Sequence, residues 1–169
     1  MFNYFYPDTY GSSLYDLPYG KFKSDGLVNI LFDIDNTIAP VDATRPGVEA
    51  VFFFCKLKEM GFNACILSNG RERRVRAFAE ALGAPYVAKA GKPFSKGLGR
   101  ALAILNAERR DTVIIGDQLF TDVLCGKRHG IHAALVRPIS DTEEWYVKLK
   151  RVFERPVLAE YKSKRGYAR

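Results

Sequence analysis

The chain is poor in the residues that build disulfide frameworks and zinc clusters. Its 169 residues include two histidines and three cysteines, and none of the cysteines lies in a C-x-x-C spacing. Cys55, Cys65 and Cys125 each sit within an apolar run, as small buried thiols do in a reducing cytosol. A disulfide scaffold and a zinc cluster are therefore both disfavoured, and we expect three free, buried thiols.

Long apolar runs are missing as well. Charged residues interrupt every apolar stretch before it reaches the roughly 20 residues of a membrane-spanning helix. Residues 1–10 contain no basic patch followed by an apolar core, so we expect no secretory signal and a cytoplasmic protein. No G-x-x-x-x-G-K-[ST] loop is present, which excludes a P-loop nucleotide site.

Positive charge is concentrated at one end of the chain. The net charge is +7, and residues 148–169 contribute +6 of it, with eight lysines and arginines against two glutamates. Because the remaining body is nearly neutral, we expect no nucleic-acid-binding surface along it. Apolar residues lie among the charges of the tail: Val152, Phe153, Val157 and Leu158. This mixture suits peripheral contact with the inner face of an anionic membrane; the alternative is a helix that packs on the domain with solvated charges.

Short apolar segments alternate with segments of helical periodicity along most of the chain. We expect strands at residues 27–32, 63–67, 85–88, 112–115 and 131–136. Helices are expected from Pro46 to Gly61 and at residues 71–82, 94–106 and 119–129. The first of these helices has apolar residues at helical spacing: Val48, Val51, Phe52 and Cys55. The alternation predicts an α/β domain, with a parallel sheet of about five strands and helices on both faces.

The same pattern divides the chain into three segments. Residues 1–26 are aromatic and turn-rich, and we expect an irregular lead-in packed on the core, with one helical turn near residues 12–15. Residues 27–140 are expected to form the core. Residues 141–169 are expected to form a basic helical tail that is broken at Pro156.

Polar residues follow three of the predicted strands at the point where each strand ends: Asp33 and Asp35, then Ser68 and Asn69, then Asp117 and Asp122. In open α/β sheets, ligands bind beyond the carboxyl ends of the strands, so we expect these side chains to converge. Residues spaced i, i+2 point the same way, so Asp33 and Asp35 would face one cavity, where a cation or a shared proton must relieve their repulsion. Oxygen-only ligands favour a hard ion such as Mg²⁺. The alternative, that Asp33 and Asp117 only cap the helices that follow, does not explain the pairing.

These residues form four ordered motifs, namely Asp33–Thr37, Ser68-Asn69, Lys92-Pro93 and Gly116–Asp122. Together they resemble the motifs of haloacid dehalogenase (HAD)-superfamily phosphatases, over about residues 27–138. More narrowly, the lead-in and the G-D-Q-L-x-T-D-V form resemble YqeG-type proteins of subclass IIIA, which are similar to mitochondrial phosphatidylglycerophosphate phosphatases. The resemblance implies a HAD-type Rossmann-like three-layer sandwich. The segment of residues 37–46 is short, and Asn69 leads directly into one helix, so neither connection is long enough to contain a cap domain. We therefore expect no cap domain and an open site.

The resemblance also implies a role for each residue. Asp33 would be the nucleophile that forms an aspartyl phosphate, and Asp35 the general acid and base. Mg²⁺ would be held by the Asp33 carboxylate, the Asp35 backbone carbonyl and Asp117, with Asp122 as a ligand or as support. The phosphate-binding residues would be Ser68, Asn69 and Lys92, with Asn69 shaping the loop. Lys89, three residues earlier, is the alternative to Lys92.

The implied function is a magnesium-dependent phosphomonoesterase. Phosphatidylglycerophosphate is placed ahead of a soluble sugar phosphate or a phosphoprotein, because an open site suits a bulky substrate such as a lipid headgroup. Closure of such a site would come from the substrate or from a partner subunit in an oligomer. Two alternatives of another class are a scaffold without turnover and an RNA- or ribosome-associated factor recruited by the tail. Four arginines after the second motif either extend over the rim of the site or form a solvated helix face: Arg71, Arg73, Arg74 and Arg76.

Overall fold

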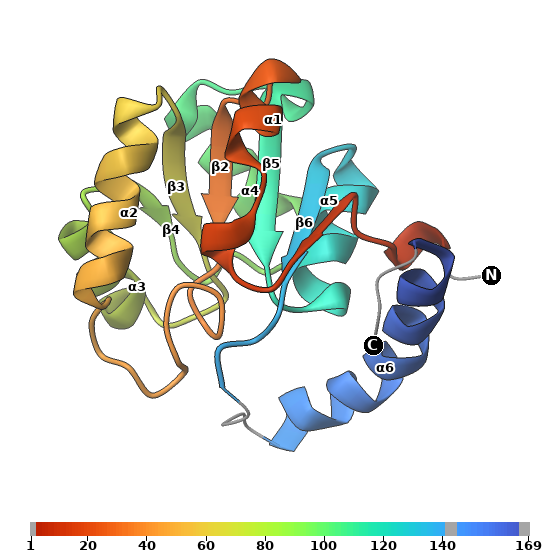
Figure 1. The fold of residues 1–169 in the computed structure, drawn as a ribbon. Coiled ribbons are helices and arrows are strands. Elements are labelled where there is room, and N and C mark those ends of the chain that lie inside the picture. Colours follow the sequence, from red (N-terminus) through yellow and green to blue (C-terminus); the bar gives the residue numbers. More distant parts are fainter. Residues whose placement is uncertain (1–2, 141–144, 166–169) are drawn as a thin grey trace.

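The computed structural model describes residues 3–140 and 145–165, with the backbone alone for residues 3, 145–151 and 165. A six-stranded sheet forms the centre of the molecule (Figure 1), with the strand order β1-β6-β5-β2-β3-β4 and every neighbouring pair parallel. The strands are β1 (Thr9–Gly11), β2 (Asn29–Phe32), β3 (Asn63–Leu67), β4 (Tyr86–Val87), β5 (Thr112–Gly116) and β6 (His132–Val136). The five strands predicted from apolar runs are all present.

The two central strands explain why the apolar runs are nearly continuous. β2 pairs with β3 on one side and with β5 on the other, so that Ile30 lies opposite both Ala64 and Val113. Every residue of β2 and of β5 is buried. Parallel strands that are covered by helices on both faces need apolar side chains on both faces, which removes the alternation seen in half-exposed strands.

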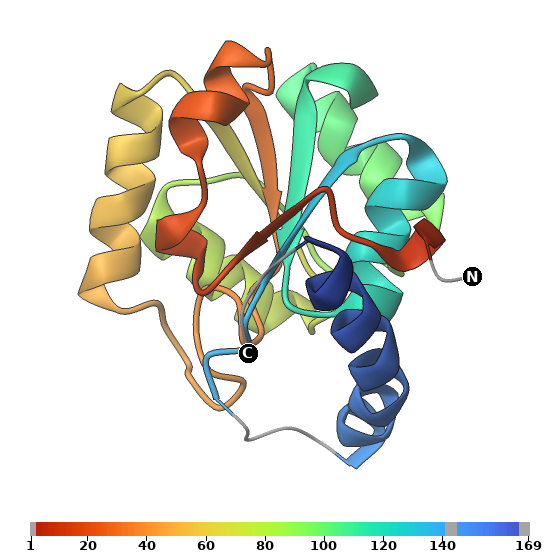
Figure 2. The ribbon, with the colours of Figure 1, turned by 45° about the vertical axis from the view of Figure 1, so that its right-hand side comes forward.

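The sixth strand lies in the segment that was expected to be irregular. Residues 9–11 pair with β6, with Thr9 opposite Ala134 and Gly11 opposite Val136 (Figure 2). The segment also contains η1 (Asn3–Phe5), the 3₁₀ turn η2 (Leu14–Asp16) and the helix α1 (Tyr19–Ser24). The prediction of about five strands was one strand short, because a three-residue edge strand is too short to show a periodic pattern. The division into three segments stays a prediction.

Helices cover both faces of the sheet and make a three-layer sandwich (Figure 1). They are α2 (Val48–Glu59), α3 (Glu72–Leu82), α4 (Ser95–Leu105), η3 (Arg109–Asp111), the π-helical turn η4 (Leu119–Val123), α5 (Leu124–His129) and α6 (Trp145–Arg165). One core contains side chains of α1, α2 and α3, including Phe22, Phe54 and Phe78. The other contains side chains of α4, α5 and α6, including Leu98, Cys125 and Val157. The predicted α/β fold class is confirmed.

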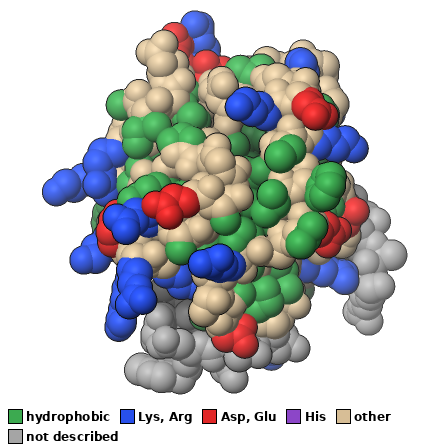
Figure 3. Space-filling model, turned by 90° about the vertical axis from the view of Figure 1, so that its left-hand side faces the viewer, with side chains coloured by type: hydrophobic (Ala, Val, Ile, Leu, Met, Phe, Trp, Pro, Cys, Tyr) green, Lys and Arg blue, Asp and Glu red, His purple; other side chains and the backbone are tan. Residues whose placement is uncertain are grey.

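The apolar spacing of α2 identified the helix but not its buried face. Ala50, Phe54 and Leu57 are buried, whereas Val48 and Phe52 are 76% and 74% exposed. α2 lies on the side of the molecule that Figure 3 shows, where apolar side chains lie open to solvent among basic ones. Cys55 is exposed on this helix, so the prediction of three buried thiols was wrong for Cys55 and correct for the other two.

The helix α6 packs on the domain along one face. Among the side chains described for this helix, at residues 152–164, the buried ones are Glu154, Val157 and Tyr161, and Tyr161 lies edge-on to the ring of Tyr6 at 5.4 Å. The predicted break at Pro156 was wrong, since the helix continues through it; a proline removes one backbone hydrogen bond, and packing of the residues that follow it holds the helix. No helix among the described residues is both long and apolar enough to cross a bilayer.

Candidate active site

The topology brings three of the predicted motifs together. β2 lies between β3 and β5, so the carboxyl ends of these three strands are neighbours. Asp33 follows β2, Ser68 follows β3 and Asp117 follows β5. All three are buried. The convergence predicted from the strand ends is therefore seen in the structure.

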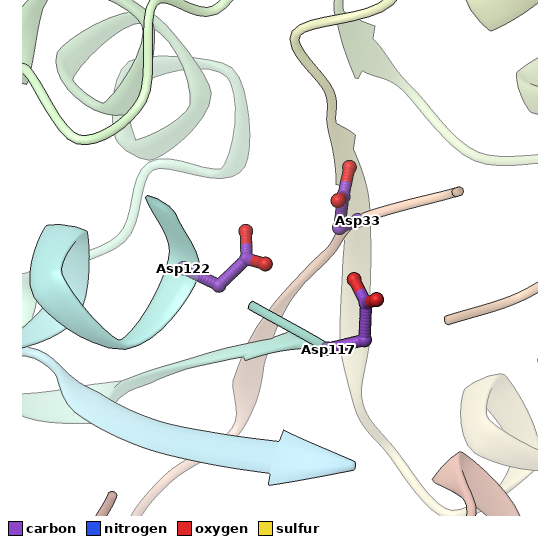
Figure 4. A group of neighbouring side chains, drawn as sticks. All are labelled: Asp33, Asp117 and Asp122. Atoms are coloured by element: carbon purple, nitrogen blue, oxygen red, sulfur yellow. The ribbon is translucent and has the colours of Figure 1, made fainter. Parts of the chain in front are cut away.

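Three carboxylates form the centre of the site. Oxygen atoms of Asp33, Asp117 and Asp122 lie within 4.8 Å of one another (Figure 4). Asp122 comes from η4 and is fully buried, and its carboxylate accepts a hydrogen bond from the backbone N–H of Gln118 at 3.2 Å. Buried acids this close repel one another unless a cation lies between them. Their oxygens are the donors that Mg²⁺ prefers, so the residues present fit that ion.

Gly116 makes room for this arrangement. A Cβ atom at this position would lie 2.1 Å from Cγ of Asp122 and 2.2 Å from its Oδ2. Any side chain at the end of β5 would therefore displace the Asp122 carboxylate. The glycine that begins the fourth motif is required by this close approach rather than by its backbone conformation.

Lys92 supplies a buried positive charge to the group. Its Nζ lies 3.0 Å from Oδ1 of Asp33 and 2.7 Å from Oδ1 of Asp122. Burial alone lowers the pKa of Lys92, but the two carboxylates outweigh it and hold the pKa above the ordinary value. Burial raises the pKa of Asp33 to about 6, against the opposing charge of Lys92 and with Asp122 adding to the rise. Lys89 is exposed, so of the two candidate lysines Lys92 is the one that lies in the site.

Asn69 holds the backbone of Lys92 in place. The Asn69 amide donates to the Lys92 carbonyl at 3.1 Å, and its oxygen accepts the Lys92 backbone N–H at 2.8 Å. Ser68 is buried, and its Oγ accepts the N–H of Gly70 at 3.1 Å, which fixes the turn after β3. Asn69 therefore positions the lysine, and Ser68 presents its hydroxyl from a fixed turn.

The carboxylate of Asp35 points elsewhere than the predicted metal group. Among the described residues it is not one of the three clustered acids, and it forms an ion pair with Arg74. The resemblance implies a metal contact through the Asp35 backbone carbonyl, so that expectation stays a prediction. The Asp35 side chain is 29% exposed.

Arg74 is a residue whose place the sequence left open. It is half-buried and also donates from Nε to the carbonyl of Ala43 at 3.2 Å and from Nη2 to that of Pro40 at 3.3 Å. Its guanidinium lies 4.9 Å from the ring centroid of Phe78, one turn further along α3. The spacing of Arg74 to the buried Phe78 was the available signal, because i and i+4 residues share a helix face. The other three arginines of this segment are exposed.

The tail helix α6 contacts η4, the turn that carries Asp122. The buried Glu154 of α6 accepts the backbone N–H of Phe120 at 3.2 Å, within the turn that carries Asp122. On the N-terminal side, the ring of Phe5 lies edge-on to Phe120 at 5.4 Å. The sequence did not predict these contacts, because they join residues from both ends of the chain to η4.

Comparison with known proteins agrees with the four motifs. A family model described as HAD-hydrolase-like matches residues 89–151. The chain is 36% identical over 161 residues to the probable phosphatase YqeG of Bacillus subtilis, covering 95% of this chain and 94% of that protein. It is 26% identical over 132 residues to the chloroplastic phosphatidylglycerophosphate phosphatase 1 of Chlamydomonas reinhardtii, covering 72% of this chain and 49% of that protein.

The fold has solved counterparts as well. A putative HAD-superfamily, subfamily IIIA hydrolase from Legionella pneumophila superposes with a TM-score of 0.55 at 16% identity, covering 70% of this chain and 69% of that one. This likeness shows the fold. The family is shown by the 36% identity to the Bacillus protein, which extends over nearly the full length of both chains. A scaffold without turnover is thereby set aside, whereas association with RNA through the tail stays an alternative. The chain belongs to the YqeG-type phosphatases of the HAD superfamily.

Proposed function

We propose that this phosphatase is a magnesium-dependent phosphomonoesterase that works through an aspartyl phosphate on Asp33. The observation that supports the proposal best is the place of Asp33, at the end of β2, where it contacts the Lys92 ammonium and lies within 4.8 Å of the carboxylate oxygens of Asp117 and Asp122. Asp33, Asp117, Asp122 and the Asp35 carbonyl would hold the ion. Bound Mg²⁺ supplies positive charge that lets an anionic nucleophile approach an anionic phosphate.

The residues then divide the reaction into two displacements. An Asp33 oxygen attacks phosphorus, the bond from phosphorus to the ester oxygen breaks, and Asp35 protonates the departing alkoxide. Asp35 next takes a proton from a water molecule, which attacks the aspartyl phosphate and releases inorganic phosphate. Lys92 and the Ser68 hydroxyl would hold the phosphoryl oxygens through both steps.

Phosphate release from a panel of phosphomonoesters tests this proposal. The panel contains lipid, sugar, nucleotide and peptide esters, each assayed with Mg²⁺ and with EDTA. We expect turnover with Mg²⁺ alone and none for Asp33→Asn, whose amide keeps the volume but cannot attack phosphorus. Full activity in EDTA would contradict the metal requirement, and a phosphoryl group found on another residue by mass spectrometry would contradict the role of Asp33.

We place phosphatidylglycerophosphate ahead of soluble sugar phosphates and phosphoproteins as the substrate. The relative from Chlamydomonas carries that activity in its name, and this chain spans about half of that protein. No covering domain is inserted in the two described connections beside the site, since β2 ends at Phe32 and α2 begins at Val48, while β3 ends at Leu67 and α3 begins at Glu72. Faster hydrolysis of a sugar phosphate than of the lipid in mixed micelles would reverse this order.

We further propose that the exposed face of α6 contacts an anionic membrane. Val157 is buried and Leu158 packs against the core, so these two are not available to lipid, whereas Val152 and Phe153 are 56% and 62% exposed. The helix therefore packs on the domain through Val157 and Leu158, as the alternative expected, while Val152 and Phe153 stay exposed to solvent. Near an anionic surface each lysine or arginine contributes about 1 kcal/mol.

Vesicle co-sedimentation tests the membrane contact. We expect binding that requires anionic lipid, weakens with salt and falls in a variant combining Phe153→Asn with Arg155→Glu. Arg155 is chosen because Lys162 and Lys164 lie over the rings of Tyr10 and Tyr6, where charge reversal would disturb packing. Arg76→Glu on α3 is the matched control. Equal binding to neutral and anionic vesicles, or to neither, would contradict the idea.

A further inference from the structure

Arg74 is fixed in the site but keeps hydrogen-bonding capacity. A guanidinium has five N–H groups. Three of them donate to Asp35, Pro40 and Ala43, which leaves two that are donated to no described residue. The side chain is 24% exposed and that of Asp35 is 29% exposed, so both are accessible to solvent. The planar fork of a guanidinium matches the oxygens of phosphate and carboxylate groups.

The position of Arg74 places it near the leaving group of the substrate. In the proposed reaction, Asp35 protonates the ester oxygen, so Asp35 lies on the leaving-group side of the phosphoryl group. Arg74 contacts the Asp35 carboxylate directly, and it therefore lies on that side as well. Lys92, by contrast, contacts the nucleophile Asp33 and serves the phosphoryl group itself.

We infer that Arg74 forms a subsite for an anionic group carried by the leaving alcohol; in phosphatidylglycerophosphate, the substrate placed first above, that group is the phosphodiester of the headgroup. This inference rests on the proposed role of Asp35, and it adds a feature that selects among phosphomonoesters. It concerns the water-soluble headgroup, so it holds whether or not the protein sits on a membrane.

Two soluble esters separate the subsite from simple positioning of Asp35. Glycerophosphoglycerol phosphate carries a phosphodiester in its alcohol, whereas glycerol phosphate does not, and both have alkoxide leaving groups that need Asp35. We expect the wild-type protein to have a higher kcat/KM for glycerophosphoglycerol phosphate than for glycerol phosphate. Arg74→Gln should reduce kcat/KM for glycerophosphoglycerol phosphate by a factor at least about tenfold larger than for glycerol phosphate. Equal losses on both esters would show that Arg74 only positions Asp35, and would overturn the inference.

Two further measurements complete the test. Glycerophosphoglycerol, which has the phosphodiester but no phosphomonoester, should bind to the wild-type protein in calorimetry and bind at least about tenfold more weakly to Arg74→Gln. Unchanged binding, or none in the wild type, would also overturn the inference. Arg76→Gln is the control, since Arg76 is exposed on the same helix and pairs only with Glu80 among the described residues, at 3.5 Å.

The outcomes also distinguish this inference from the proposed function. The protein could hydrolyse p-nitrophenyl phosphate and glycerol phosphate without preferring glycerophosphoglycerol phosphate. That result would support the proposed function and contradict the subsite. Failure to hydrolyse any ester in the presence of Mg²⁺ removes the proposed function, and the calorimetric measurement then decides on the subsite alone. Thermal unfolding of Arg74→Gln confirms that the variant is folded before either result is used.

Discussion

The ammonium of Lys92 lies 2.7 Å from Oδ1 of Asp122, and both side chains are almost completely buried. The same Nζ contacts Asp33 at 3.0 Å, so one lysine joins the proposed nucleophile to an acid of the fourth motif. In a buried setting each partner depends on the other, because an unpaired charge is costly there. The stability of the site and its chemistry are therefore linked through Lys92.

Removal of the lysine should affect both properties. Lys92→Met leaves Asp33 and Asp122 as buried acids without their cation, and we expect it to lower the free energy of unfolding in EDTA by about 3–5 kcal/mol. Phosphatase activity should fall to background. Denaturant unfolding and phosphate release measure the two effects. Lys89→Met is the control, because Lys89 is exposed, and a similar loss in that variant would contradict the assignment.

A methyl group at position 116 should displace an acid from the site. In Gly116→Ala the new Cβ would meet the Asp122 carboxylate at 2.1–2.2 Å, so the side chain must move away from Lys92. We expect a loss of about 1–3 kcal/mol in stability and a fall of roughly 100-fold in kcat. Gly99→Ala is the matched control, since no atom outside its own stretch of α4 lies within 4 Å of the added methyl group. Wild-type turnover by Gly116→Ala would show that Asp122 is not needed where it lies.

The role of Asp35 predicts a dependence on the leaving group. Asp35→Asn keeps an acceptor for Arg74 but cannot donate a carboxylic proton. Alkoxide esters should slow by about 10²–10⁴-fold, whereas p-nitrophenyl phosphate, whose phenolate needs little protonation, should slow far less. Steady-state rates on the two ester classes measure this difference. A uniform loss would indicate that Asp35 serves the metal or the loop instead.

His132 should make stability depend on pH. Burial lowers the pKa of His132, whose Nε2 lies 2.8 Å from Oγ1 of Thr9 and which lines a cavity of about 440 Å³ at the amino ends of β5 and β6. The unfolded chain therefore binds this proton more readily than the folded chain. The contribution is fully present above the unfolded pKa of about 6.5, and stability falls as the pH drops through the lowered folded value.

Unfolding measured between pH 7 and pH 5 checks this direction. His132→Gln should flatten the decline in this range, because the substituted side chain does not titrate. A slope that is unchanged in His132→Gln would assign the decline to other groups.

The sequence alone was sufficient for five of the six strands and for the acids at their ends. β2 and β5 are buried on both faces, so they must be apolar throughout, and this leaves a plain signal along the chain. Asp33 and Asp117 directly follow these strands, so a parallel sheet brings them together whatever the details of packing. These features depend on neighbours in sequence and on the rule of parallel pairing.

The tertiary structure decided which charges meet. Lys92 and Asp122 are thirty residues apart, and Arg74 and Asp35 are thirty-nine residues apart, so no local pattern pairs them. Likewise, β1 exists because β6 offers an edge to three residues of the N-terminal segment, and the buried face of α6 is set by contacts with η4 and Tyr6. Local periodicity records which residues avoid water, whereas the partner of a buried charge is chosen by the packing of distant elements, because only the folded chain brings the two together.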